Sequence, residues 1–111
     1  MSLIKHQQEF LLDVCKLVQY ATEQGFVVTG GELWRSPEQQ KIYVQTGRSK
    51  TMKSKHLNRV AIDLNIFKDG KIASFKDAEI LGNYWESLNP LNRWGGRFRT
   101  LVDQPHFERN V

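Results

Sequence analysis

The spacing of apolar residues in the first quarter of the chain is helical. Between residues 3 and 24 they recur at steps of three and four, with Gln, Glu and Lys between them. This pattern predicts an amphipathic helix over Leu3–Gln24, ended by Gly25. Residues 26–31 then cluster Phe and two Val before Thr and a Gly pair, which predicts a short buried strand.

A second helix is predicted by its start signals. Ser36 can cap it, Pro37 suits the first helical position, and Gln39 completes a capping-box pattern. We expect this helix to run from Pro37 to about Gln45. The basic and polar residues 48–55 follow and predict an exposed loop, either a solvated face or the cationic lip of a binding cleft.

The second half of the chain begins with a clean alternation. Over Val60–Phe67 apolar residues form one face and polar residues, with Ala61 and Phe67, the other, which predicts a strand with an apolar back. The Asp-Gly pair within residues 68–71 predicts a hairpin turn into a short strand at residues 72–73.

The last third of the chain combines a helical pattern with two short irregular or extended segments. Helical spacing covers residues 77–88, residues 94–98 form a glycine-bent segment, and residues 105–108 predict a last short strand. Trp85, Trp94 and Phe98 are expected in the core rather than as substrate platforms. The predicted fold class is α+β, a small antiparallel sheet with flanking helices.

Composition limits the architecture to one domain. The 111 residues are 40% hydrophobic and 25% charged, which predicts a single globular domain over residues 1–111. The net charge of +4 favours anionic partners without the basic stripe of a nucleic-acid binder, and the aromatic residues are not interleaved with the basic loop. We therefore expect no nucleic-acid partner, and a monomer.

The single cysteine and the distribution of apolar residues bear on where the protein is made. Cys15 stands at an apolar helical position and is expected to be a core residue. No membrane-spanning run and no signal peptide are expected, so the sequence predicts cytoplasmic synthesis.

Chemistry-bearing residues gather around two of the three histidines. His56 precedes the alternating strand, Asp63 lies on that strand's polar face, and His106 follows Pro105. Two imidazoles and one carboxylate can hold Zn²⁺ with a position open to water, although isolated residues of these types are also common as plain surface groups. His6 is expected to be a surface histidine.

Two acidic residues are candidates for the general base of such a site. Asp103 lies three residues before His106, across a turn that contains Pro105, and can reach an attacking water. Glu108 shares a strand face with His106, so it is either a competing base or a group that orients the histidine from behind.

Two segments carry a family resemblance. Residues 54–63 run Ser-Lys-His-Leu-Asn-Arg-Val-Ala-Ile-Asp, and residues 103–108 run Asp-Gln-Pro-His-Phe-Glu. They resemble the S-x-H-x-x-G-x-A-x-D motif and the closing acid-and-histidine motif of the LAS-type zinc peptidases, which include D-Ala-D-Ala carboxypeptidases and phage L-alanyl-D-glutamate endolysins. Residues 94–96 (Trp-Gly-Gly) and 34–40 are similar to further segments of the endolysin-like branch.

The resemblance implies a hedgehog/DD-peptidase-like zinc fold and a set of roles. It implies that zinc is bound by His56, Asp63 and His106, with Asp103 as the general base. It further implies substrate contacts from the side chains of Arg35 and Ser54. The motif's glycine is Arg59 here, which costs about 1 kcal/mol if that position needs a positive φ.

The resemblance also implies a function. It predicts a zinc-dependent peptidase that acts on peptidoglycan stem peptides after release to the cell wall or periplasm. The Trp-Gly-Gly segment favours an L-alanyl-D-glutamate endopeptidase of phage or prophage type. The alternatives are a D-alanyl-D-alanine carboxypeptidase and a catalytically silent zinc-binding module, since a fold alone does not fix a function.

Overall fold

A computed structural model describes all residues 1–111 as a small α+β fold, the class expected from the sequence. Its extents are 36 × 34 × 23 Å. In chain order the elements are α1 (Leu3–Glu23), β1 (Val27–Gly30), α2 (Pro37–Gln45), the 3₁₀ turn η1 (Lys55–Asn58), β2 (Ala61–Lys68), β3 (Lys71–Ile72), α3 (Phe75–Leu88), β4 (Asn92–Trp94), the 3₁₀ turn η2 (Gly95–Arg97) and β5 (His106–Arg109).

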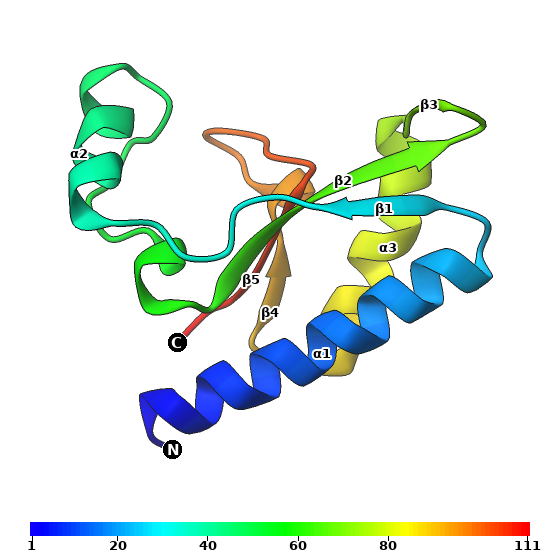
Figure 1. Ribbon diagram of the computed structural model, residues 1–111, viewed down its shortest axis with the longest axis horizontal. Coiled ribbons are helices and arrows are strands. Elements are labelled where there is room, and N and C mark those ends of the chain that lie inside the picture. The colour runs from blue at the N-terminus through cyan, green and yellow to red at the C-terminus, as the bar shows by residue number, and fades with distance from the viewer.

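The sheet is antiparallel throughout, in the order β1-β2-β5-β4, with β3 paired to β2 in a hairpin (Figure 1). The hairpin forms at the expected Asp69-Gly70 turn, where both residues have positive φ. The short strand β4 was not expected. The prediction of a buried strand at residues 26–31 was wrong in its burial, because β1 is an edge strand whose Val27 is 62% exposed; only Phe26 enters the core.

Serine caps set the starts of all three helices. The hydroxyl oxygens of Ser2, Ser36 and Ser74 accept hydrogen bonds from backbone N–H groups one turn into α1, α2 and α3. The bounds of α1 and α2 agree closely with prediction. Helix α3 begins at Phe75, two residues earlier than expected, because Ser74 caps it.

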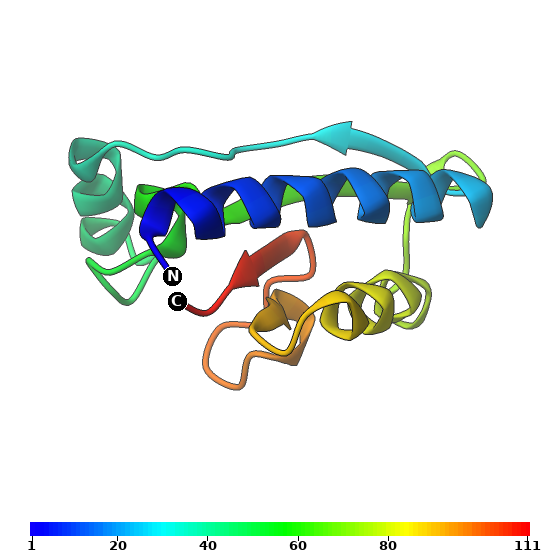
Figure 2. The ribbon, with the colours of Figure 1, turned by 90° about the horizontal axis from the view of Figure 1, so that it is seen from below.

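The core lies between α1, α3 and the sheet. Helix α1 runs along most of the molecule's length, and α2 sits at one end, away from α3 (Figures 1 and 2). Buried apolar side chains come from α1, β2, α3, β4 and β5, and include Phe10, Leu17, Leu64, Leu81, Trp85, Trp94 and Phe107. No helix is long and apolar enough to cross a membrane.

Two expectations about the core need correction. Cys15 is exposed, because the buried stripe of α1 passes through the neighbouring Val14 and then Leu17, which leaves Cys15 on the outer face. Phe98 is only partly buried, whereas Trp85 and Trp94 are fully buried as expected.

A buried polar network joins helix and sheet beneath the core. Arg109 Nη2 donates to Asp13 Oδ2 at 2.7 Å, and Asn92 Nδ2 donates to the same oxygen at 3.1 Å. All three side chains are nearly inaccessible to solvent. Because a buried charge is costly without its partner, this network fixes the end of β5 against α1. It thereby helps to fix the strand that carries His106.

Candidate metal centre

The pairing of β2 with β5 brings two of the expected site residues together. In this antiparallel register Asp63 stands directly opposite His106. Residues opposite one another on paired strands project from the same face of the sheet. Accordingly Asp63 Oδ1 lies 3.4 Å from His106 Nδ1, although 43 positions separate the two residues in the chain.

His56 reaches the same point from the turn η1. Ser54 caps this turn, its hydroxyl accepting a hydrogen bond from the His56 N–H at 3.2 Å. Arg59, which stands at the motif's glycine position, ends the turn in the left-handed region at φ 56°. His56 Nε2 consequently lies 3.4 Å from Asp63 Oδ1.

The three side chains present a set of ligand atoms to one point. One donor atom from each of His56, Asp63 and His106 lies within 4.8 Å of the others. His56 Nε2 and Asp63 Oδ1 are buried and make no hydrogen bond. Buried polar atoms without partners are uncommon in folded proteins, so these atoms fit a cation between them.

Hydrogen bonds behind the ligands select which ring nitrogens face that point. His56 Nδ1–H donates to the backbone carbonyl of Leu33 at 2.9 Å, which leaves the lone pair on Nε2. His106 Nε2–H donates to Glu108 Oε1 at 2.7 Å, which leaves the lone pair on Nδ1. Such outer partners commonly orient metal-binding histidines. The sequence pattern gave no sign of the Leu33 contact.

Charges at the site are strongly coupled. Burial of His106 would by itself favour the neutral ring, but the carboxylates of Asp63 and Glu108 raise its pKa to about 9. Burial likewise opposes ionisation of Asp63, yet the two imidazoles beside it lower its pKa well below the ordinary value. The carboxylate is therefore ionised and available as a ligand.

Asp103 lies beside this cluster without belonging to it. Its Oδ2 is 3.9 Å from His106 Nδ1, on the Asp63 side of the ring, and its side chain is 44% exposed. Burial and the repulsion of Asp63 raise the pKa of Asp103 above its usual range, although the positive charge of His106 acts in the opposite direction. Glu108 contacts the other ring nitrogen, so its position favours an orienting role over that of a base.

Arg35 and Ser54 lie in contact with each other near the cluster. Arg35 Nη1 donates to Ser54 Oγ at 3.3 Å and to Gln40 Oε1 at 2.8 Å, and its Nε donates to Glu32 Oε1 at 2.6 Å. The Arg35 side chain is 11% exposed. Its guanidinium is thus already held within the protein.

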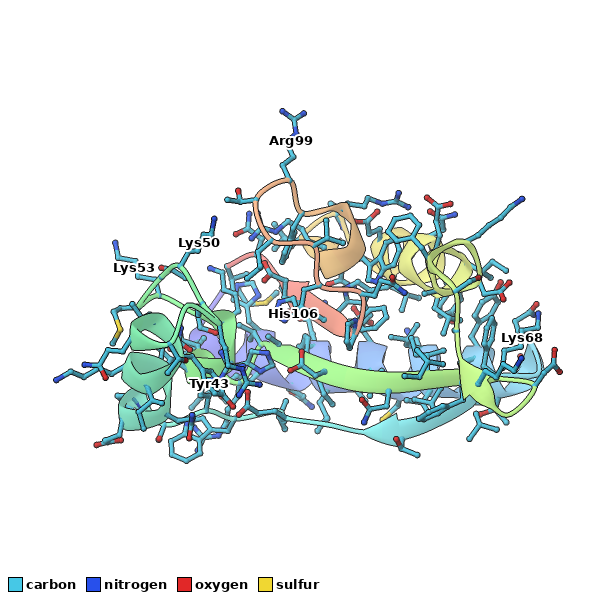
Figure 3. The ribbon with its side chains drawn as sticks, turned by 90° about the horizontal axis from the view of Figure 1, so that it is seen from above. Tyr43, Lys50, Lys53, Lys68, Arg99 and His106 are labelled. Carbon is cyan, nitrogen blue, oxygen red and sulfur yellow. The ribbon has the colours of Figure 1, made fainter.

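One cleft of about 960 Å³ is lined by all the site residues expected from the sequence, namely Arg35, Ser54, His56, Asp63, Asp103, His106 and Glu108. Phe98 also lines it, with its ring centroid 5.5 Å from that of His106, so this aromatic ring faces the cleft and was missed as a candidate contact. Figure 3 shows His106 between the loop after α2 and the loop that carries Arg99.

Comparison with known proteins is consistent with this geometry. A family model described as D-alanyl-D-alanine carboxypeptidase matches residues 47–109, which make up more than half of the chain and include His56, Asp63 and His106. The chain belongs to this peptidase family. The resemblance found in residues 54–63 and 103–108 is therefore confirmed.

Two similar proteins fill out the comparison. The L-alanyl-D-glutamate peptidase of Listeria phage A118 is 33% identical over 100 residues, which cover 86% of this chain and 34% of that protein. The chain thus spans about a third of that relative's length. The crystal structure of the Serratia marcescens L-Ala D-Glu endopeptidase ChiX matches with a TM-score of 0.68 and 24% identity, over 87% of this chain and 77% of that one, which supports the fold.

Proposed function

We propose that this chain is a zinc-dependent peptidoglycan peptidase that hydrolyses the stem-peptide bond between L-alanine and D-glutamate. The observation that carries the proposal is the convergence of three ligand atoms within 4.8 Å, with Asp103 beside them in an open cleft. Membership of a peptidase family and similarity to a phage L-alanyl-D-glutamate peptidase support the same substrate class. The place of action is the bacterial cell wall.

His56 Nε2, Asp63 and His106 Nδ1 would hold the zinc ion. Two neutral imidazoles and one carboxylate leave a net positive centre, and a zinc ion so bound polarises a carbonyl and lowers the pKa of water toward ~7. His56 Nε2 and Asp63 Oδ1 are buried without hydrogen-bond partners, which a bound ion would explain and a purely structural packing role would not.

Asp103 supplies the proton transfers. Its carboxylate takes a proton from the attacking water and passes it to the leaving amine, so the acid and base roles alternate on one group. Its partial exposure leaves it in contact with the cleft, and its raised pKa suits a group that must hold a proton between the two steps. Glu108 and the Leu33 carbonyl keep the two imidazoles in position meanwhile.

The test is release of new amino groups from purified peptidoglycan, with the fragments identified by mass. We expect the zinc-loaded protein to cut between L-Ala and D-Glu and the chelated protein to be inactive. Asp103→Asn should bind one equivalent of zinc yet lose at least about 100-fold in rate. Asp69→Asn, in the exposed hairpin turn, makes the same change outside the cleft and should keep full activity.

Two other outcomes would redirect the assignment. Release of free D-Ala would show a D-alanyl-D-alanine carboxypeptidase, the activity that names the family model. Similarity to a phage L-alanyl-D-glutamate peptidase favours the endopeptidase over this alternative. Zinc binding without any cleavage would leave a silent zinc-binding module and end the enzyme proposal.

A further inference from the structure

Four cations on the two lips of the cleft lack an acidic partner. Arg48, Lys50 and Lys53 stand on the loop after α2, and Arg99 stands on the loop between η2 and β5. All four are exposed and line the cleft that contains His106. None takes part in an ion pair, whereas Arg93, Arg97 and Arg109 all do.

The acidic residues of the cleft do not neutralise these lips. Glu32 is paired with Arg35, and Glu108 is paired with Arg93. Asp63 lies between the two imidazoles, and Asp103 lies beside His106, with its Oδ2 3.9 Å from that ring's Nδ1. Unpaired cations around a concave site add their fields there and attract anions more strongly than the same charges scattered over a flat surface.

The lips frame the metal-ligand cluster. In Figure 3 the side chains of Lys50, Lys53 and Arg99 project to the same side of the molecule, from two separate loops, and His106 lies between the loops. Lys68 lies at the opposite end. A peptide lying across His106 would therefore pass between cations on both sides.

The proposed substrate carries charge where these lips stand. A glutamate joined to alanine through its amine, and to the next residue through one carboxyl group, keeps its other carboxyl group free. The residue on the leaving side of the scissile bond is thus anionic unless it is amidated. Arginine presents a planar fork of donors that matches a carboxylate, and lysine adds a point charge.

We propose that the lips formed by Arg48, Lys50, Lys53 and Arg99 bind free carboxylates of the stem peptide and make the enzyme selective for acidic over amidated peptides. This inference rests on the proposed function and names the substrate form that the same cleft takes. Amidation replaces an oxygen by NH₂ at nearly the same shape, so it removes the charge with little change in fit.

The experiment uses two synthetic peptides that contain L-Ala–D-Glu and differ only in whether the free glutamate carboxyl group is amidated. For the zinc-loaded protein at low salt we expect kcat/KM to favour the acidic peptide about tenfold, mainly through KM. The double variant Lys50→Gln, Arg99→Gln should lower the preference below about threefold, as should salt near 0.5 M. Lys71→Gln, an exposed cation outside the cleft, is the matched control and should leave the preference unchanged.

Calorimetric binding of both peptides to Asp103→Asn separates this inference from the function itself. Tighter binding of the acidic peptide, lost when the lip substitutions are added, supports the inference. It does so even if the zinc-loaded wild-type protein cleaves neither peptide, because that failure would refute only the proposed function. Equal binding and equal cleavage of the two peptides would overturn it. Equal peptide binding together with lip-dependent retention on a glycerol phosphate polymer would also overturn it and assign the lips to wall phosphates.

Discussion

At the scale of single residues, Glu108 orients the ring of His106. Glu108 accepts a hydrogen bond from His106 Nε2 on one carboxylate oxygen and from Arg93 Nε on the other, so both oxygens are engaged. It fixes the imidazole with Nδ1 facing the ligand cluster. The residue therefore influences metal affinity without contacting the ion's expected position.

This role predicts the behaviour of Glu108→Gln. The amide keeps the shape but weakens the acceptor that holds His106, and loss of such partners commonly lowers metal affinity about 10- to 100-fold. Zinc affinity measured by competition with a chelator should fall by that factor. Glu79→Gln, whose carboxylate pairs with Arg97 outside the cleft, serves as the control and should not change the affinity. An unchanged affinity in Glu108→Gln would show that the contact does not orient the ring.

Arg59 is a non-glycine residue in a backbone conformation that lowers the stability of the folded chain. It occupies the left-handed region at φ 56°, and its guanidinium lies 5.1 Å from the centre of the Trp34 ring. Replacement by Gly or by Ala removes that cation–π contact equally, but only Gly adopts this φ without steric cost. We expect Arg59→Gly to be more stable than Arg59→Ala by about 1 kcal/mol. Urea unfolding of both variants measures the difference, and equal midpoints would show that η1 relaxes instead.

At the scale of elements, the path from β4 through η2 to β5 positions the proposed base Asp103 and the proposed ligand His106 together. Asp103 N–H donates to the Gly95 carbonyl at 2.9 Å, and His106 N–H donates to the Asp103 carbonyl at 3.0 Å. Gly95 has no room for a side chain, because a Cβ would overlap the Asp103 carbonyl oxygen and lie 2.8 Å from His106 Cβ. Gly96 packs equally closely against the ring of Trp94. The two glycines of the Trp-Gly-Gly segment therefore let its backbone pack directly against Asp103, His106 and the Trp94 ring.

This packing predicts that Gly95→Ala damages both stability and activity. Overpacking of this kind costs about 1–3 kcal/mol, and the displaced Asp103 and His106 should lower kcat/KM by about tenfold or more. Denaturant unfolding and the peptidoglycan assay measure the two effects. Gly30→Ala has no neighbouring atom within 4 Å of its new Cβ and no positive φ, so it should be close to neutral. Wild-type activity in Gly95→Ala would contradict the role given to this segment.

At the scale of the whole molecule, the ligands join parts of the fold that are remote in sequence. His56 comes from η1, Asp63 from β2 and His106 from β5. A metal that binds only this folded arrangement stabilises the entire domain, by about 2.7 kcal/mol at a free concentration 100 times its Kd. Urea unfolding with zinc and with chelator should show this difference. His56→Gln should abolish it.

The same stabilisation should depend on pH. The pKa of His106 is raised to about 9 without metal, so its protonated form stabilises the metal-free fold fully below about 6.5 and progressively less as the pH rises through 9. Zinc must displace that proton. We expect the zinc-dependent gain in unfolding free energy to grow as the pH rises from 6 to 9. A gain that is constant with pH would show that His106 is not a ligand.

The sequence by itself determined what depends on neighbours along the chain. The helix bounds followed from Ser36, Pro37 and the apolar spacing of α1, and the hairpin followed from Asp69-Gly70. These features are local because caps, turns and periodicity involve residues within a few positions of one another. Two short motifs also predicted the residues of the proposed metal centre, and the fold brings His56, Asp63 and His106 together.

Only the tertiary structure decided what depends on remote contacts. The register of β2 against β5 places Asp63 opposite His106, and the Leu33 carbonyl selects the free nitrogen of His56. The exposure of Cys15 and of β1 was decided by which faces the other elements cover. Strand pairing and burial join residues tens of positions apart, so no local pattern encodes them uniquely.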